Sequence, residues 1–153
     1  MRFNSIPRLW RRFLALPRGR RWLLMEAALC LALARIGILL LPFPRIARHL
    51  GTLHAPSAGA ADSLAGKAMA EDISWAIDRA ARLSPVPLVC LPRALAGWKM
   101  LQRRGISARL HFGASRKPGG KTLLTHAWLD ACGVEVSGYP QAHNCVEMGY
   151  YTC

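Results

Sequence analysis

Acidic residues are scarce in this sequence, and the shortage is greatest in its first third. The chain has 153 residues, with 8 Asp and Glu against 21 Lys and Arg and a formal net charge of +13. Residues 1–50 hold ten arginines and one acidic residue, Glu26. A segment of this charge either forms a solvated surface or meets acidic peptides, nucleic acid or anionic lipid.

Paired cysteines are also missing. The five cysteines are an odd number and include no C-x-x-C pair, which argues against a disulfide framework of the kind found in small secreted domains. Seven arginines precede the first apolar run, where a signal peptide would have a short apolar stretch and a small-residue cleavage site. We therefore expect a cytoplasmic protein with reduced thiols.

Motifs for metal and nucleic-acid binding are absent. Cys132, His143, Cys145 and Cys153 are zinc-ligand types, but their spacing matches no standard zinc site. The basic charge and Trp10 favour nucleic acid, yet no groove-reading or base-stacking motif accompanies them. We expect no metal, no cofactor and no nucleic-acid partner.

The apolar run "WLLMEAALCLALARIGILLL", residues 22–41, is long enough to cross a membrane. Glu26 and Arg35 lie nine positions apart, on opposite faces of a helix, and an arginine at mid-bilayer costs about 2.5–3.5 kcal/mol. This favours a helix packed between protein surfaces that supply a partner to each charge. Membrane contact through residues 22–41 stays open as the alternative.

Three segments follow from composition and turn signals. Residues 1–55 form a basic, apolar helical segment that includes a short helix in "LPFPRIARHLG", ended by Gly51. Residues 56–66 are a linker or loop within the Ala-, Ser- and Gly-rich stretch that begins at Thr52. Residues 67–153 form the main domain.

The main domain is predicted to be α+β. A helix over 67–83 places Met69, Ile73, Ala76, Ile77 and Ala80 on its core face, and a second helix follows Cys90 with Trp98 and Met100 in the core. Period-two alternation in "ISARLHFGA", then "TLLTHAWLD" and "VEVSG", predicts strands. Two helices followed by neighbouring strands indicate helices packed on a small antiparallel sheet.

Cys90 and His126 are the candidate catalytic pair. A thiol becomes a useful nucleophile as thiolate, which a helix N-terminus or a nearby imidazole favours. Cys90 directly precedes the predicted helix, and His126 is centred in a predicted strand. From the residues alone, two buried core side chains are the commoner explanation of this pattern.

"CLPRALAGWKMLQRRGISARLHFGAS" followed by "HAWLDACGVEVSGYP" closely resembles the leader peptidases, or B proteins, of lasso-peptide biosynthesis. The resemblance implies a transglutaminase-like, papain-like fold in which Cys90 attacks a leader-peptide carbonyl and His126 acts as base and then acid. It also implies three partners: the precursor leader, a separate leader-recognition protein and the lasso cyclase. The winged-helix module that binds leaders in some members has no counterpart here.

The third catalytic residue differs from that family, whose members place an acidic residue about twelve positions after the histidine. This chain has Ser137 and Gly138 there. Asp130 lies about 13 Å from His126 along a strand, at 3.3 Å per residue, and Glu135 has the wrong spacing. We assign the role to Asn144, which requires the tail to fold over the sheet, as would its rival Glu147.

The sequence thus predicts a cysteine peptidase that removes the leader from a ribosomally made, lasso-type precursor. The alternative is a non-catalytic, membrane-associated or partner-binding helical protein with a degenerate protease-like core. The missing acidic residue is the feature that favours this alternative.

Overall fold

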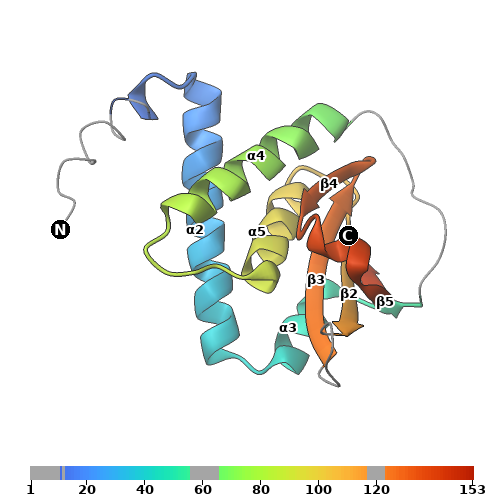
Figure 1. Cartoon of the computed structure of the whole chain (residues 1–153). Helices are drawn as coiled ribbons and strands as arrows, with labels where there is room; N and C mark the ends of the chain where they lie inside the picture. Colours follow the sequence, from blue (N-terminus) through green and yellow to red (C-terminus); the bar gives the residue numbers. More distant parts are fainter. Residues whose placement is uncertain (1–10, 12, 56–65, 117–122) are drawn as a thin grey trace.

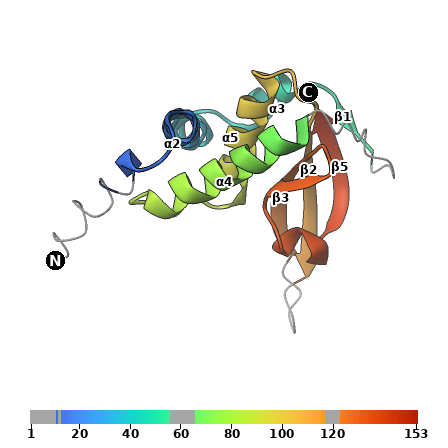
Figure 2. The ribbon, with the colours of Figure 1, turned by 90° about the horizontal axis from the view of Figure 1, so that it is seen from above.

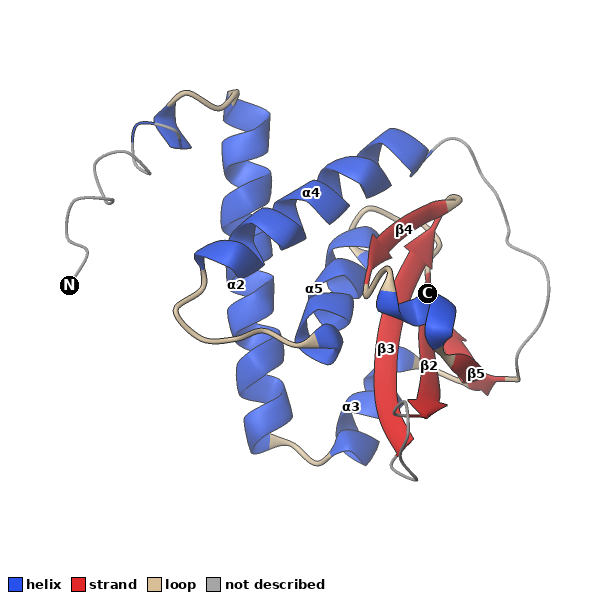
Figure 3. Ribbon diagram, in the orientation of Figure 1, coloured by secondary structure: helices blue, strands red, loops and turns tan. Residues whose placement is uncertain are grey.

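The structure is a computed structural model that describes residues 11, 13–55, 66–116 and 123–153. It is mixed helix and antiparallel sheet (Figure 3), which confirms the predicted α+β class. Three layers are seen from above in Figure 2: helix α2 (Arg18–Leu40), then helices α4 (Lys67–Leu83) and α5 (Cys90–Gln102), then the sheet. The predicted linker, apart from Gly66, lies outside the described residues.

The sheet has five strands in the order β1-β5-β2-β3-β4, and all neighbours are antiparallel. Strands β2 (Arg109–Arg116), β3 (Leu123–Ala131) and β4 (Val134–Ser137) match the predicted ones, although β2 begins three residues later than expected. Strand β5 (Val146–Thr152) was not predicted, because "VEMGYYT" lacks a clear alternation. A short 3₁₀ helix, η3 (Gln141–Asn144), precedes it.

The loop expected from Thr52 onward is wrong at its beginning. Leu53–His54 form strand β1, which pairs with Tyr151 and Tyr150 of β5. Helix α3 (Phe43–Leu50) precedes this strand and ends at Gly51, whose φ of 95° is left-handed, as predicted. The N-terminal segment therefore contributes an edge strand to the sheet (Figure 1).

Helix α2 packs one face against α4 and α5. That face buries Leu23, Leu24, Ala27, Cys30 and Leu31. Glu26 meets Arg104, with Oε2 and Nη2 2.6 Å apart, so the predicted partner for Glu26 is confirmed. Arg35 has no ion-pair partner among the described residues; it borders a groove with Ala80 and Leu83 of α4.

The core lies between α4, α5 and the sheet. Trp98 and Met100 are buried there, as predicted. Met69 is wrong as a core residue, because it is 38% exposed while its neighbour Ala70 is fully buried. An ion pair between Arg93 and Asp78 ties α5 to α4.

The described residues contain one helix, α2, that could cross a membrane by length and composition, with a mean hydropathy of 2.2 over its most apolar stretch. In that stretch 28% of the residues are buried against the protein. Core helices meet the same criterion, so this finding alone assigns no membrane role.

Candidate active site

Cys90 is the first residue of α5, as the sequence predicted. Pro85 and Pro87 disfavour helix in the residues before them, so the chain reaches Cys90 extended, with Val89 at φ −75° and ψ −173°. The thiol is half-buried and free. Unpaired amides at a helix N-terminus favour a negative charge nearby, and none of the other four cysteines begins a helix.

His126 lies on β3, where the strand is at the edge of the sheet. Strand β4 pairs with β3 only from Leu129 onward, so the β3 backbone at His126 has β2 on one side and no strand of the described sheet on the other. Leu129 faces the helices, since a Cβ built on Gly97 of α5 would be 2.6 Å from its Cδ2. Successive side chains alternate, so His126 and Trp128 belong to the other face.

The His126 ring is held by two contacts. Its Nε2 lies 2.7 Å from the backbone carbonyl oxygen of Gly138, and its ring stacks on Trp128 at a centroid distance of 6.2 Å. A carbonyl only accepts, so Nε2 carries the proton and donates. In the neutral ring Nδ1 is then the acceptor, which is the state that a general base requires.

Helix α5, which begins at Cys90, packs beside β3 (Figure 1), but His126 belongs to the face of the sheet turned away from the helices. Among the described contacts, no hydrogen bond joins the Cys90 thiol to the His126 ring. The pairing of the two therefore stays a prediction.

Asn144, the third residue assigned from sequence, lies in η3 and is exposed. The hydrogen bond of the His126 Nε2 goes to Gly138 instead, twelve residues along the chain. This is the position where the resembling family places its acidic residue. Sequence reasoning looked for a side chain there and so missed the backbone carbonyl.

His111 is a second histidine that sequence reasoning did not select. It is 7% exposed on the face of the sheet away from the helices, stacked on Trp128 with ring planes 3° apart. Its Nδ1 lies 2.9 Å from Glu147 Oε1, and its Nε2 lies 3.3 Å from Asp130 Oδ2. Burial lowers the pKa of His111, but the two carboxylates outweigh it and raise the pKa overall.

Of the three acidic residues weighed as partners of His126, Asp130 and Glu147 are thus engaged with His111, and Glu135 pairs with His143. Asp130 also accepts a hydrogen bond from the Tyr139 hydroxyl. Burial and this carboxylate raise the pKa of Tyr139, so the phenol stays protonated at neutral pH.

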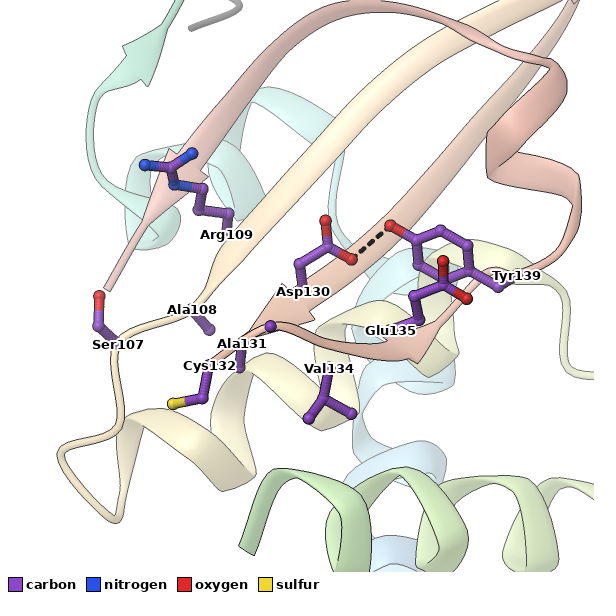
Figure 4. Close-up of a pocket in the computed structure, with 10 residues that line it drawn as sticks. Ser107, Ala108, Arg109, Asp130, Ala131, Cys132, Val134, Glu135 and Tyr139 are labelled. Carbon is purple, nitrogen blue, oxygen red and sulfur yellow. Dashed lines mark hydrogen bonds between the residues drawn. The ribbon is translucent and has the colours of Figure 1, made fainter. Parts of the chain in front are cut away.

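A cavity of about 230 Å³ lies beside Asp130 and Tyr139. Figure 4 shows the side chains that line it. Asp130, Glu135 and Tyr139 line one side, and Cys132, Ser107 and Arg109 line the other. Neither Cys90 nor His126 lines it. The cavity belongs to the end of the sheet at which β3 turns into β4.

The cysteines and histidine considered as zinc ligands lie in separate contacts. His143 pairs with Glu135, Cys145 donates toward the Gln141 carbonyl and Cys153 toward the Ile106 carbonyl. Within the ranges that the structure describes, no group of three or more His, Cys, Asp or Glu side chains is arranged to hold a metal ion.

A cysteine at a helix start beside an antiparallel sheet that carries a histidine defines a recognisable class of α+β domain. The family model of the transglutaminase-like superfamily matches residues 37–147. The chain therefore belongs to the transglutaminase-like superfamily, which includes cysteine peptidases. No curated protein and no solved structure matches the chain significantly.

Proposed function

We propose that this chain is a cytoplasmic cysteine peptidase that removes the leader peptide from a ribosomally made, lasso-type precursor. The observation that carries the proposal is the hydrogen bond from His126 Nε2 to the Gly138 carbonyl. It supplies the orienting group that the sequence lacks as an acidic side chain, and it leaves Nδ1 free as a base.

In this mechanism Cys90 and His126 would have to meet around the open edge of the sheet beside His126. The Cys90 thiol then gives its proton to His126 Nδ1, and the sulfur attacks a leader-peptide carbonyl carbon. The resulting negative charge on sulfur forms at the positive end of α5. His126 then returns the proton to the leaving amine, which leaves a thioester on Cys90. His126 takes a proton from water, the water oxygen attacks the thioester carbon, and the C–S bond breaks to release the carboxylic acid. His126 returns its proton to the Cys90 sulfur, which restores the free thiol.

Gly138 keeps the imidazole in the right tautomer through both steps. Its φ of 92° is left-handed, and a Cβ built there would lie 2.6 Å from Trp128 Cβ. Glycine is therefore the residue that allows the backbone to approach β3 so closely. Asn144 is retained as a rival orienting group that would have to turn toward His126 during the reaction.

The proposed partners are the precursor leader, a separate leader-recognition protein and the lasso cyclase. They rest on the resemblance to lasso B proteins alone, while the superfamily membership supports the class of domain.

The test is cleavage of candidate precursors with a recognition protein present, read by mass spectrometry. Cys90→Ala should lose activity by about a thousandfold or more, whereas Cys145→Ala, which removes another half-buried thiol, should keep it. Near-normal cleavage by folded Cys90→Ala would remove the peptidase proposal.

The second candidate function is a non-catalytic, partner-binding protein with a degenerate protease-like core. One observation favours it: no hydrogen bond links Cys90 to His126 in the described contacts. This candidate predicts no cleavage of any precursor by the wild type, together with retained binding to the cyclase or the recognition protein.

A further inference from the structure

Helix α2 presents an uninterrupted apolar stripe on the side turned away from α4 and α5. The stripe consists of Trp22, Met25, Leu29, Leu33, Ile36 and Leu40, and each of these side chains is at least 49% exposed. The spacing of three or four residues keeps them on one helix face over about 27 Å, at 1.5 Å per residue. A row of this length exceeds the scattered apolar residues of an ordinary surface.

Two charged side chains of α2, Glu26 and Arg20, are paired with other parts of the protein. Glu26 is held by Arg104, and Arg20 pairs with Asp72 and lies over the Trp75 ring. The stripe can therefore enter an apolar phase without burying those charges. The objection that Glu26 raises to a membrane-spanning helix does not apply to a helix lying on a surface, because α2 keeps its other face on the protein.

A basic recess lies at the N-terminal end of the stripe. It has a volume of about 290 Å³ and is lined by Phe13, Arg18, Arg21, Trp22 and Met25. Neither Arg18 nor Arg21 has an ion-pair partner among the described residues. Two guanidinium groups beside a tryptophan and a methionine match a phosphate group that carries an apolar chain.

We propose that α2 docks on an anionic phospholipid surface, with the stripe among the acyl chains and the recess around a headgroup phosphate. The charge distribution favours lipid over a protein partner, since residues 1–21 contain seven arginines and no acidic residue. Figure 2 shows α2 at the end of the molecule opposite the sheet, so a docked helix leaves the sheet away from the membrane plane. This role is independent of the peptidase proposal.

The experiment is flotation of the full chain with vesicles of phosphatidylcholine alone, and of phosphatidylcholine mixed with phosphatidylglycerol. Binding should need the anionic lipid and should fall at 1 M salt, where the Debye length is about 3 Å. Arg18→Gln with Arg21→Gln should weaken binding by about twentyfold or more, at about fivefold per arginine. Free inorganic phosphate should compete only weakly, because it lacks the acyl chains that the stripe would bind.

The matched control compares two double substitutions of exposed apolar residues. Leu29→Glu with Leu33→Glu should abolish flotation, while Val146→Glu with Met148→Glu on β5 should leave it unchanged. Circular dichroism and thermal unfolding show whether both variants are folded. Equal binding to neutral and anionic vesicles, equal loss in the β5 variant, or no flotation of the wild type would overturn the proposal. Binding of the stripe to the recognition protein, with no binding to vesicles, would also overturn the proposal.

Discussion

His126 and His111 lie on neighbouring strands of one sheet and have opposite surroundings. His111 is buried between two carboxylates, Asp130 and Glu147, which raise its pKa. His126 lies at an open sheet edge, and its hydrogen-bond partner is an uncharged carbonyl. Trp128 stacks on both rings. The same side chain thus lies between negative charges in one place and against an uncharged carbonyl in the other.

The difference between the two histidines reflects where the few acidic residues form ion pairs. Six of the seven acidic residues that the structure describes form ion pairs, and each of the six has a partner outside its own helix or strand: Glu26, Asp72, Asp78, Asp130, Glu135 and Glu147. None is bonded to His126. In this chain the acidic side chains connect the fold, and the backbone orients the proposed base.

Removing His126 should give the largest effect on activity. His126→Ala should slow precursor cleavage by about a thousandfold, because general acid–base catalysis contributes about 10²–10⁴ in rate. His143→Ala removes an exposed histidine and should cleave normally. Cleavage rates are measured by mass spectrometry. Equal rates for His126→Ala and His143→Ala would contradict a catalytic role for His126.

Displacing the Gly138 carbonyl should have the second largest effect on activity. Gly138→Ala should lower the free energy of unfolding by about 1–3 kcal/mol and reduce cleavage, because the new Cβ meets Trp128 and Ala127 at a left-handed φ. Gly105→Ala is the control, since its φ of 64° is also left-handed but no atom lies within 4 Å of the new Cβ. If Gly138→Ala cleaved the precursor as well as Gly105→Ala does, the carbonyl would not be orienting His126.

The His111 cluster should affect stability rather than chemistry. A raised pKa in the folded state means stabilisation that is complete below the unfolded value, about pH 6.5, and lost as the pH rises through the folded pKa. Glu147→Gln should therefore cost about 2 kcal/mol at pH 6 and less at pH 9. Urea unfolding across this range tests the sign, and a cost that grows with pH would contradict it.

Removing the ion pair between Glu26 of α2 and Arg104, just after α5, should have the smallest effect on stability. The hydrogen bond from Arg104 lowers the pKa of Glu26, so its stabilisation is present above the unfolded value and is lost as the pH falls through the folded pKa. Glu26→Gln should lower the free energy of unfolding by about 1 kcal/mol at pH 7. The cost should vanish in acid, and a difference that persists at pH 2 would speak against the ion pair.

Local patterns predicted most of the helices and strands, because each depends on neighbours in the sequence. Helix α4 was found at its observed bounds, and Cys90 was placed at the start of α5 from the prolines before it. Strands β1 and β5 were missed, since their pairing joins residues about 100 positions apart. The carbonyl of Gly138 was missed for a similar reason: a backbone atom becomes an orienting group only through tertiary contact.

The most direct measurement of the central claim is the rate at which iodoacetamide alkylates Cys90 at neutral pH, read by mass spectrometry in the wild type, His126→Ala and His143→Ala. The proposed pair predicts that Cys90 reacts faster than Cys145 in the wild type. His126→Ala should slow alkylation at Cys90 alone, and His143→Ala should change neither rate. A Cys90 rate that is indifferent to His126 would show that the two side chains do not act together.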